Sequence, residues 1–367
     1  MGLKDPPGPG GAAAAGEDGA FSGVGGWPAV LRRLMRREAL GADLAALALG
    51  EILDGNATPA QTAAFIVGMR MKGETVEEMT GLVSAMLDHS VPVVVPGELV
   101  DTCGTGGDGS RSINISTIAA LVVAGAGPTV CKHGGRAASS SAGSADVLQA
   151  LGVVIDLGPD GVARCLEEAG IGFCFAPRFH PAMRHAAPVR AELGVPTLFN
   201  FLGPMANPAR ARHQVLGVSD PAMAEKMIGV LEARGSRRAL VVYGHDGLDE
   251  LTTTTTSTVL QYDRLGRRRY EVDPAALGLR PARPEDLRGA DAATNAALAR
   301  SVLEGEGGAR LDVVLLNAAA GLVAAGTAAD LTEGLGQAEA SVTSGAAAAA
   351  LERLVEVSQE AAADGMR

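Results

Sequence analysis

Two strand–turn–helix units follow one another within residues 100–146, and this succession restricts the fold more than any other feature of the chain. In the first unit a short apolar strand ends near Thr102, a glycine-rich turn spans 104–109, and an apolar helix starts at about Ile115. The second unit begins with strand 129–132 and continues through a turn of small and polar residues. Glycine lets backbone N–H groups converge on an anion, and a helix N-terminus adds partial positive charge. The two turns therefore predict a phosphate-binding site.

Strands and helices continue to alternate after this region, which predicts an α/β fold with a central, mainly parallel (mixed) sheet covered by helices. We expect helices at 147–151, 161–169, 180–193 and 221–234, and strands at 153–157, 172–176, 214–218 and 239–243. The threonine run 252–256, followed by the apolar residues 259–262, breaks the alternation and predicts an antiparallel ribbon. From Asp291 onward the pattern is helical again.

A helical pattern before the first strand predicts a separate small domain of about four helices. Thr58-Pro59-Ala60-Gln61 combines an N-cap, a proline at the first helical position and a capping-box partner. Thr75-Val76-Glu77-Glu78 repeats the capping box. The expected division of the chain is a disordered tail over 1–25, a small helical domain over 26–95 joined by helices from about 180–205, and a large α/β domain over 96–367.

Composition narrows the range of functions. A net charge of −11 argues against a general nucleic-acid binder, because affinity for the phosphate backbone comes mainly from Lys and Arg. The four cysteines lack CxxC spacing and indicate reduced thiols in a cytosolic protein. Cys103 adjoins the glycine turn, where a nucleophile is conceivable. We prefer a buried, inert cysteine, because that is the commoner environment of this residue. We expect neither a signal peptide nor a membrane span.

Charged residues at two strand ends strengthen the phosphate hypothesis. Lys132 and His133 end a buried strand, and the C-terminal strand ends of an α/β sheet face its ligand. A solvated surface pair is the alternative. Asp249 and Glu250 follow another apolar strand; adjacent acids are commonly solvated, but facing a phosphate loop they would suit Mg²⁺. Arg190 could pair with a nearby glutamate or hold a substrate carboxylate bidentately.

As a set, the motifs closely resemble the anthranilate phosphoribosyltransferase family, in order and at the family's spacing from about Trp27 to the C-terminus. The stretches that carry the resemblance are GTGGD at 104–108, NIST at 114–117, KHGGRAASS at 132–140, GSAD at 143–146, HPAMRHAAPVRAELG at 180–194, FNFLGPMANPA at 199–209 and DGLDELT at 246–252.

The resemblance implies an Mg²⁺-dependent pentosyltransferase of tryptophan biosynthesis. Such an enzyme moves the phosphoribosyl group of 5-phosphoribosyl diphosphate (PRPP) to the amine of anthranilate and releases diphosphate. The resemblance also implies a cytoplasmic homodimer with a cleft between its two domains, a pair of Mg²⁺ ions per subunit, and neither nucleic acid nor membrane as a partner.

The family's residue roles are carried over by position. The residues implied to surround PRPP are Gly104, Gly107, Asp108, Ser112, Asn114, Ile115, Ser116, Thr117, Lys132, His133, Gly134, Gly135, Arg136, Ala137, Ala138, Ser139, Ser140 and Ser144. Those implied to hold anthranilate are Gly104, His133, Gly135 and Arg190. Ser116, Asp249 and Glu250 are implied as metal ligands, and Lys132, Asp249 and Glu250 as catalytic residues.

One position departs from the family pattern in a way that bears on the acceptor. The family's second loop contains KHGNR, whereas this chain has Gly135 in place of the asparagine. The missing amide would contact anthranilate, and one lost hydrogen bond costs about 1 kcal/mol. Glycine also adds loop entropy. A paralogue that binds PRPP but uses the acceptor weakly or differently is therefore an alternative. Ser112 replaces the usual threonine and keeps the hydroxyl.

Two further alternatives are weighed on the same motifs. A pyrimidine nucleoside phosphorylase shares the fold but has KHS in the second loop, where this chain has KHG at 132–134. A non-catalytic, nucleic-acid-binding relative would lose the PRPP loop and carry a basic surface. Here GTGGD and the acidic pair are intact and the net charge is −11. The transferase interpretation is preferred over both.

Overall fold

The computed structural model describes residues 19–137 and 142–365. A seven-stranded sheet in the order β3-β2-β1-β4-β5-β6-β7 forms the centre of the large domain. The strands are β1 (Val100–Gly104), β2 (Val130–Gly134), β3 (Ile171–Phe175), β4 (His213–Gly217), β5 (Arg238–Gly244), β6 (Ser257–Asp263) and β7 (Gly266–Val272). The first five strands are parallel to one another. Strand β6 runs antiparallel to β5, and β7 runs antiparallel to β6. The expected mixed, mainly parallel α/β sheet is confirmed.

The strand order reverses between β1 and β4. From β1 the chain moves outward through β2 to β3, then returns to the other side of β1 and continues outward from β4 to β7. Loops that leave β1 and β4 thus run in opposite directions and leave a crevice at their C-terminal ends, where open α/β sheets bind ligands.

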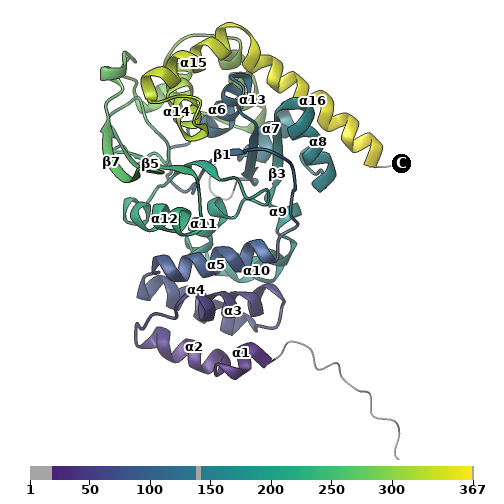
Figure 1. The fold of residues 1–367 in the computed structure, drawn as a ribbon, viewed down its shortest axis with the longest axis vertical. Helices are drawn as coiled ribbons and strands as arrows, with labels where there is room; N and C mark the ends of the chain where they lie inside the picture. The colour runs from purple at the N-terminus through teal and green to yellow at the C-terminus, as the bar shows by residue number, and fades with distance from the viewer. Residues whose placement is uncertain (1–18, 138–141, 366–367) are drawn as a thin grey trace, which may run out of the picture.

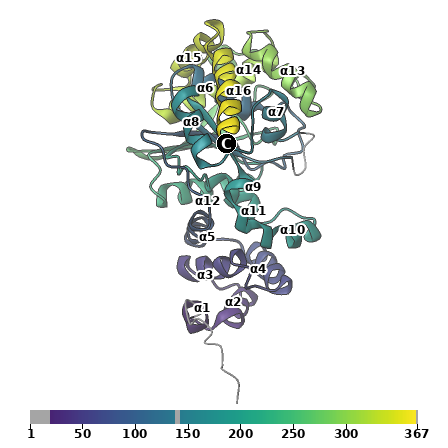
Figure 2. The ribbon, with the colours of Figure 1, turned by 90° about the vertical axis from the view of Figure 1, so that its right-hand side faces the viewer.

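One face of the sheet is covered by long helices from the middle and C-terminal parts of the chain (Figures 1 and 2). These helices are α6 (Ile115–Gly125), α7 (Ser144–Ala150), α8 (Pro159–Ala169), α13 (Ala292–Leu303), α14 (Ala309–Ala325), α15 (Leu331–Thr343) and α16 (Ala346–Gly365). The other face is covered by α9 (Ala176–Phe179), α11 (Phe199–Leu202) and α12 (Pro221–Ala233), beyond which the helical domain lies.

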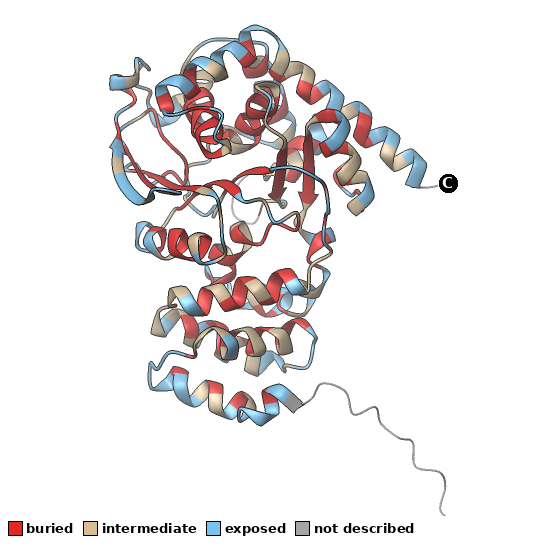
Figure 3. Ribbon diagram, viewed as in Figure 1, coloured by how far each residue is buried: buried red, intermediate tan, exposed pale blue. Residues whose placement is uncertain are grey.

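The buried residues divide between these two faces (Figure 3). Side chains of a strand point alternately to opposite faces. On β5, Leu240 and Val242 join the core beneath the long helices, and Ala239 and Val241 join a second core that continues into the helical domain. Because the second core is shared, the helical domain is anchored to the underside of the sheet rather than tethered by a linker alone.

The helical domain contains α2 (Gly26–Met35), α3 (Ala42–Leu53), α4 (Pro59–Lys72) and α5 (Val76–Asp88). Both predicted capping boxes are present, at Thr58–Gln61 and at Thr75–Glu78. The short helix α10 (Ala187–Leu193) packs on α4, and its Val189 belongs to the same core. An additional helix, α1 (Gly19–Gly23), extends the domain toward the N-terminus.

Helix α1 shortens the tail that the sequence predicts. The expectation of disorder covered 1–25, but the ring of Phe21 packs on Trp27 with centroids 5.3 Å apart. Phe21 is buried. Residues 19–25 are therefore part of the helical domain, and the rest of the predicted tail lies outside the described residues.

Three predicted elements differ from the structure. Residues 153–157 pair with no strand of the described sheet. Val153, Ile155 and Leu157 are nevertheless buried, because they pack against the hydrophobic core. The helix expected at 180–193 is divided into a 3-10 turn, η1 (Pro181–His185), and α10, since Pro188 starts a new helix. The threonine run 252–256 is a loop, but the predicted antiparallel ribbon is confirmed directly after it, where residues 259–262 lie in β6 between β5 and β7.

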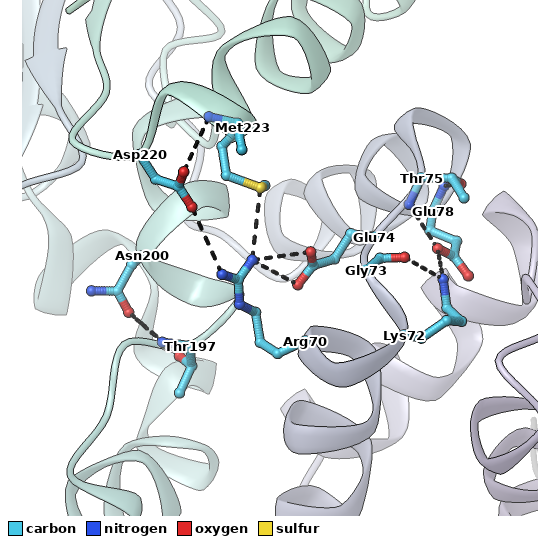
Figure 4. Close-up of polar contacts among 11 residues, drawn as sticks. Arg70, Lys72, Gly73, Glu74, Thr75, Glu78, Thr197, Asn200, Asp220 and Met223 are labelled. Atoms are coloured by element: carbon cyan, nitrogen blue, oxygen red, sulfur yellow. Dashed lines mark hydrogen bonds and ion pairs between the residues drawn. The ribbon is translucent and has the colours of Figure 1, made fainter.

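Arg70 on α4 links the helical domain to the large domain (Figure 4). Its guanidinium is paired with Glu74 at 3.1 Å, lies 4.0 Å from Asp220 at the start of α12, and stacks over the Phe201 ring at 5.0 Å. These contacts hold the helical layer against the loops on the underside of the sheet. Among the described helices, none is both long enough and apolar enough to cross a membrane.

Candidate active site

A cavity of about 500 Å³ lies at the point where the strand order reverses. Its wall is formed by residues 103–117 after β1, residues 132–137 and 142–144 after β2, and Asn200, Asp249 and Glu250. All of the residues predicted for the site lie on this wall except Arg190 and three that fall outside the described residues, Ala138, Ser139 and Ser140. The structure thus brings together segments more than 100 residues apart in the chain.

The glycine loop after β1 is held against the acidic pair. Gly106 and Gly107 adopt φ values of 66° and 79°, a region that favours glycine. A Cβ atom on Gly104 would lie 2.4 Å from Asp249 Oδ2, so only glycine fits there. Gly106 N donates to Asp249 Oδ2 at 2.6 Å. The loop is therefore fixed by the acid that the sequence places far away.

The start of α6 is the second part of the wall. Ser116 N donates to Glu250 Oε1 at 3.2 Å, which draws this acid to the helix N-terminus. Thr117 Oγ1 donates to Ser144 Oγ at 3.0 Å and so joins the first loop to the second. Asn114 forms no side-chain cap; its amide donates to the Ala142 carbonyl at 3.0 Å. The N–H groups of Ile115, Ser116 and Thr117 already have acceptors, so the start of α6 offers an anion the partial positive charge of the helix terminus.

The second loop is organised by Asp146. Its carboxylate accepts from Ala137 N at 3.1 Å, Gly143 N at 2.9 Å and the Arg136 guanidinium at 2.6 Å. Arg136 therefore lies at the cavity but is already paired with a carboxylate, and its guanidinium also stacks over the Phe175 ring at 5.7 Å. If Arg136 also binds a ligand anion, as the sequence predicts, that anion and Asp146 must bind the same guanidinium.

Lys132 is a buried cation at the base of the cavity, with 2 % of its surface exposed. Its Nζ donates to the Thr102 carbonyl at 2.5 Å and to Ser116 Oγ at 3.4 Å. No carboxylate of the described residues lies within 4.0 Å of it, so the ammonium is free to interact with a ligand anion. The alternative of a solvated surface pair is thereby excluded for Lys132 and His133.

The carboxylates of Asp249 and Glu250 carry more negative charge than the nearby cation and hydrogen-bond donors compensate. Burial raises the pKa of Asp249 well above its usual range, and the neighbouring Glu250 and Asp108 add to the effect. Burial raises the pKa of Glu250 to about 7, although Lys132 opposes this shift. Such a site favours a cation. No group of three or more His, Cys, Asp or Glu among the described residues could hold a metal, so oxygen atoms from Ser116, water or substrate would complete the shell.

The other end of the cavity is neutral. The ring of His133 lies 5.1 Å from that of His180, and His133 Nε2 is buried without a hydrogen-bond partner in the described structure. Burial, His180 and Lys132 lower the pKa of His133 to about 3, so the imidazole is uncharged at neutral pH. Among the described residues, a Cβ on Gly135 would meet only the Ala176 side chain, at 4.0 Å, so these residues leave space where the family pattern has asparagine.

Arg190 is not on the cavity wall. Its guanidinium stacks over the Phe199 ring at 5.0 Å, and burial lowers its pKa. The residue after Phe199, Asn200, does line the cavity. Sequence reasoning quoted Asn200 within FNFLGPMANPA but gave it no role. It also left out residues that complete the glycine loop, namely Thr105, Gly106, Gly109, Ser110 and Arg111.

The chain matches two family models that divide it as the structure does. Residues 96–348 match the α/β domain of a glycosyl transferase family, and residues 28–90 match the helical bundle domain of the same family. A curated relative, anthranilate phosphoribosyltransferase of Roseiflexus castenholzii, is 57% identical over 329 residues, which cover 89% of this chain and 96% of the relative.

Solved structures agree with this assignment. Anthranilate phosphoribosyltransferase of Thermus thermophilus is similar with a TM-score of 0.86 and 43% identity, covering 90% of this chain and 99% of that one. The Saccharomyces cerevisiae enzyme in complex with PRPP and Mg is similar with a TM-score of 0.84 and 28% identity, covering 91% and 98%. Another structure of the yeast enzyme holds 4-fluoroanthranilate. On its sequence, its two domains and its fold, the chain belongs to the anthranilate phosphoribosyltransferase family.

Proposed function

We propose that this protein transfers the 5-phosphoribosyl group of PRPP to the amine of anthranilate and releases diphosphate, a step of tryptophan biosynthesis. The observation that supports this most directly is the single cavity shared by the glycine loop, Lys132 and the pair Asp249–Glu250. Backbone N–H groups, a buried cation and two hard carboxylates are the groups that a diphosphate ester and its metal require.

PRPP lies along the two loops in this proposal. The N–H groups of the glycine loop and the partial positive charge at the start of α6 attract phosphate oxygens, and the hydroxyls of Ser112, Ser116 and Ser144 add donors. Lys132 interacts with the departing diphosphate because its ammonium has no carboxylate partner within 4.0 Å among the described residues. Ala138, Ser139 and Ser140 belong to the same proposal through the family pattern.

Mg²⁺ fits the acidic end of the cavity, and the yeast relative was solved with PRPP and Mg. We assign Ser116, Asp249 and Glu250 as its ligands, for a pair of ions per subunit. When bound, Mg²⁺ would neutralise charge that develops on the leaving diphosphate. The surplus negative charge of the unliganded pair is the physical reason for this assignment.

Anthranilate is assigned to the neutral end, beside His133 and Gly135. An aromatic amine is already a nucleophile, so positioning by the cavity can serve without a strong base. His133 stays uncharged, and its Nε2 has no hydrogen-bond partner among the described residues, so it could accept from or donate to the substrate amine depending on its tautomer. Arg190 could reach the substrate carboxylate only by leaving its stack over Phe199, through movement of the helical layer that carries it.

The assembly is proposed as a cytoplasmic homodimer that acts on small molecules, without nucleic acid or membrane as a partner. The four cysteines of the chain are all free and buried, which suits a reducing compartment. The helical domain carries the exposed apolar side chains Met35, Val67 and Met71, which a second subunit could cover.

The test is turnover of anthranilate with PRPP and Mg²⁺. Consumption of anthranilate fluorescence, dependent on both PRPP and Mg²⁺, supports the proposal. PRPP binding without anthranilate turnover would favour the paralogue with altered acceptor use, for which the open space at Gly135 is the structural reason.

A further inference from the structure

Strands β1 and β2 carry the two loops of the cavity, but they pair over a shorter length than their neighbours do. The parallel pairs β2–β3, β1–β4 and β4–β5 are each in register over five positions. Strands β1 and β2 are in register only at Val100 and Val130. The two strands therefore separate toward their C-terminal ends, where the glycine loop and the second loop begin.

Two side chains bridge the strands where the backbone pairing ends. Asp101 on β1 accepts the backbone N–H of His133 on β2, with Oδ1 at 3.2 Å. Lys132 Nζ on β2 also donates to β1, to the Thr102 carbonyl at 2.5 Å. A carboxylate and an ammonium thus take the place of the missing backbone hydrogen bonds.

The second oxygen of Asp101 ties the bridge to the rest of the sheet. Oδ2 accepts from Asn207 Nδ2 at 2.9 Å and from Gln214 Nε2 on β4 at 3.5 Å. Asn207 Nδ2 also donates to the Cys131 carbonyl on β2 at 2.8 Å. Burying a carboxylate completely is costly unless donors and a cation compensate it. Asp101 is fully buried, and its donors are the His133 N–H on β2, Asn207 and Gln214 on β4.

We propose that Asp101 is a positioning residue of this site: its buried carboxylate fixes the distance between the glycine loop and the second loop, and thereby the PRPP-binding geometry. The inference rests on the proposed function, in that PRPP is the ligand that spans both loops. Asp101 does not line the cavity and touches no substrate in this account. It acts through the His133 backbone and through the charge of Lys132.

The ionised form of Asp101 is the one that accepts all of these hydrogen bonds. Burial raises its pKa to about 6, opposed by Lys132, Asn207 and the His133 N–H. The other ionisable groups that face it are Lys132 and Cys131 on β2 and Cys103 on β1, and the pKa values of both thiols are raised well above neutrality. Between about pH 6 and pH 8 Asp101 is therefore the group among these that titrates.

The test measures PRPP affinity in the presence of Mg²⁺ by calorimetry for the full chain and for Asp101→Asn, at a series of pH values. Asp263→Asn on β6 is the matched control, because Asp263 is also a buried aspartate of the sheet but lies away from the cavity. At about pH 8 we expect the Kd of Asp101→Asn to be raised about tenfold or more, and that of the control to be unchanged.

The pH dependence of the Kd ratio separates positioning by charge from a merely structural role. Below about pH 6 the wild-type carboxyl is protonated, so the ratio of variant to wild-type Kd should fall toward 1. Titration of free PRPP occurs with both proteins and cancels in the ratio. A ratio near 1 at about pH 8, or a raised ratio that does not change with pH, overturns the inference.

A second variant keeps the inference testable if Asp101→Asn does not fold. Asn207→Asp retains Asp101 but places another carboxylate against its Oδ2, which raises the pKa of Asp101. The pH at which PRPP affinity falls should move upward, and no movement would contradict the inference. If the wild type binds PRPP but does not turn over anthranilate, the assignment of anthranilate as the acceptor is contradicted, whereas the inference about Asp101 still stands. Absence of PRPP binding by the wild type removes the proposed function and this inference with it.

Discussion

The backbone N–H of Gly106 donates a 2.6 Å hydrogen bond to Asp249 Oδ2, which joins the glycine loop after β1 to the acidic loop after β5. The same aspartate packs so closely on β1 and β4 that a Cβ on Gly104 would lie 2.4 Å from Oδ2. The anion-binding loop and the proposed metal ligands therefore form one rigid unit. Changes on either side of this contact should affect PRPP and metal binding together.

Gly104→Ala tests this unit. The added methyl group overlaps Asp249 Oδ2, and the carboxylate cannot move away because its own backbone is packed on Gly217. We expect loss of PRPP affinity and of the Mg²⁺ response together, by about tenfold or more. Calorimetry with each ligand measures both. A variant that loses only one of the two would contradict the coupling.

Asp249→Asn should reduce turnover and yet stabilise the protein when Mg²⁺ is absent. The carboxylate is buried beside Glu250 and Asp108, and its pKa is raised well above the usual range, so its ionised form destabilises the folded state. The amide removes that charge and also a metal ligand. We expect kcat to fall about 100-fold. Thermal unfolding without Mg²⁺ should shift upward; a downward shift would show that the negative charge is already compensated.

The effect of Mg²⁺ on stability should depend on pH. Burial raises the pKa of Glu250 in the folded state to about 7, from its ordinary value of 4.5, so between these values the folded protein binds more protons than the unfolded chain. Its contribution to stability is present at low pH and is lost as the pH rises toward 7. Mg²⁺ replaces the proton, so the metal should raise the unfolding temperature more at about pH 8 than at about pH 5.

Glu250→Gln is the variant for that measurement. The amide does not ionise, so the Mg²⁺ effect on the unfolding temperature should lose most of its pH dependence. An unchanged dependence would assign the titration to Asp249 or to another group.

Gly135→Asn should improve the use of anthranilate and leave PRPP binding unchanged. Of the residues that the structure describes, the new Cβ meets only Ala176, at 4.0 Å, and Gly135 does not adopt the positive φ that would strain asparagine. One added hydrogen bond is worth about 1 kcal/mol, or roughly fivefold in KM. Steady-state kinetics with both substrates measure the effect. Gly135→Ala, which fills the space without an amide, is the control and should not show the gain.

Much of this site could be predicted from the sequence, because strand patterning, helix capping and the order of the motifs all indicate the same fold and the same site. The loops after β1 and β2 and the acidic pair after β5 all stand at C-terminal ends of buried parallel strands, a place that strand patterning alone can locate. The capping boxes at Thr58 and Thr75 marked their helices correctly, because capping depends only on neighbours three residues apart.

The remaining features depend on contacts that the sequence pattern does not express. Residues 153–157 have the apolar alternation of a strand, but packing alone buries them and no described strand lies beside them. Asn200 joins the cavity because α11 crosses beneath the sheet, and Arg190 stays off its wall because Phe199 holds the guanidinium. The role inferred for Asp101 depends on the separation of β1 and β2 beyond their single paired position, and no sequence pattern indicates that separation.

The most direct test of the central claim is a fluorescence assay of anthranilate consumption with PRPP and Mg²⁺, run on this protein and on Lys132→Met. Lys132 is the buried cation of the cavity, and its loss should lower kcat about 100-fold because the departing diphosphate loses its compensating charge. The account predicts PRPP- and Mg²⁺-dependent consumption by the wild type and little by the variant. No consumption by the wild type, or equal rates for the two proteins, would contradict it.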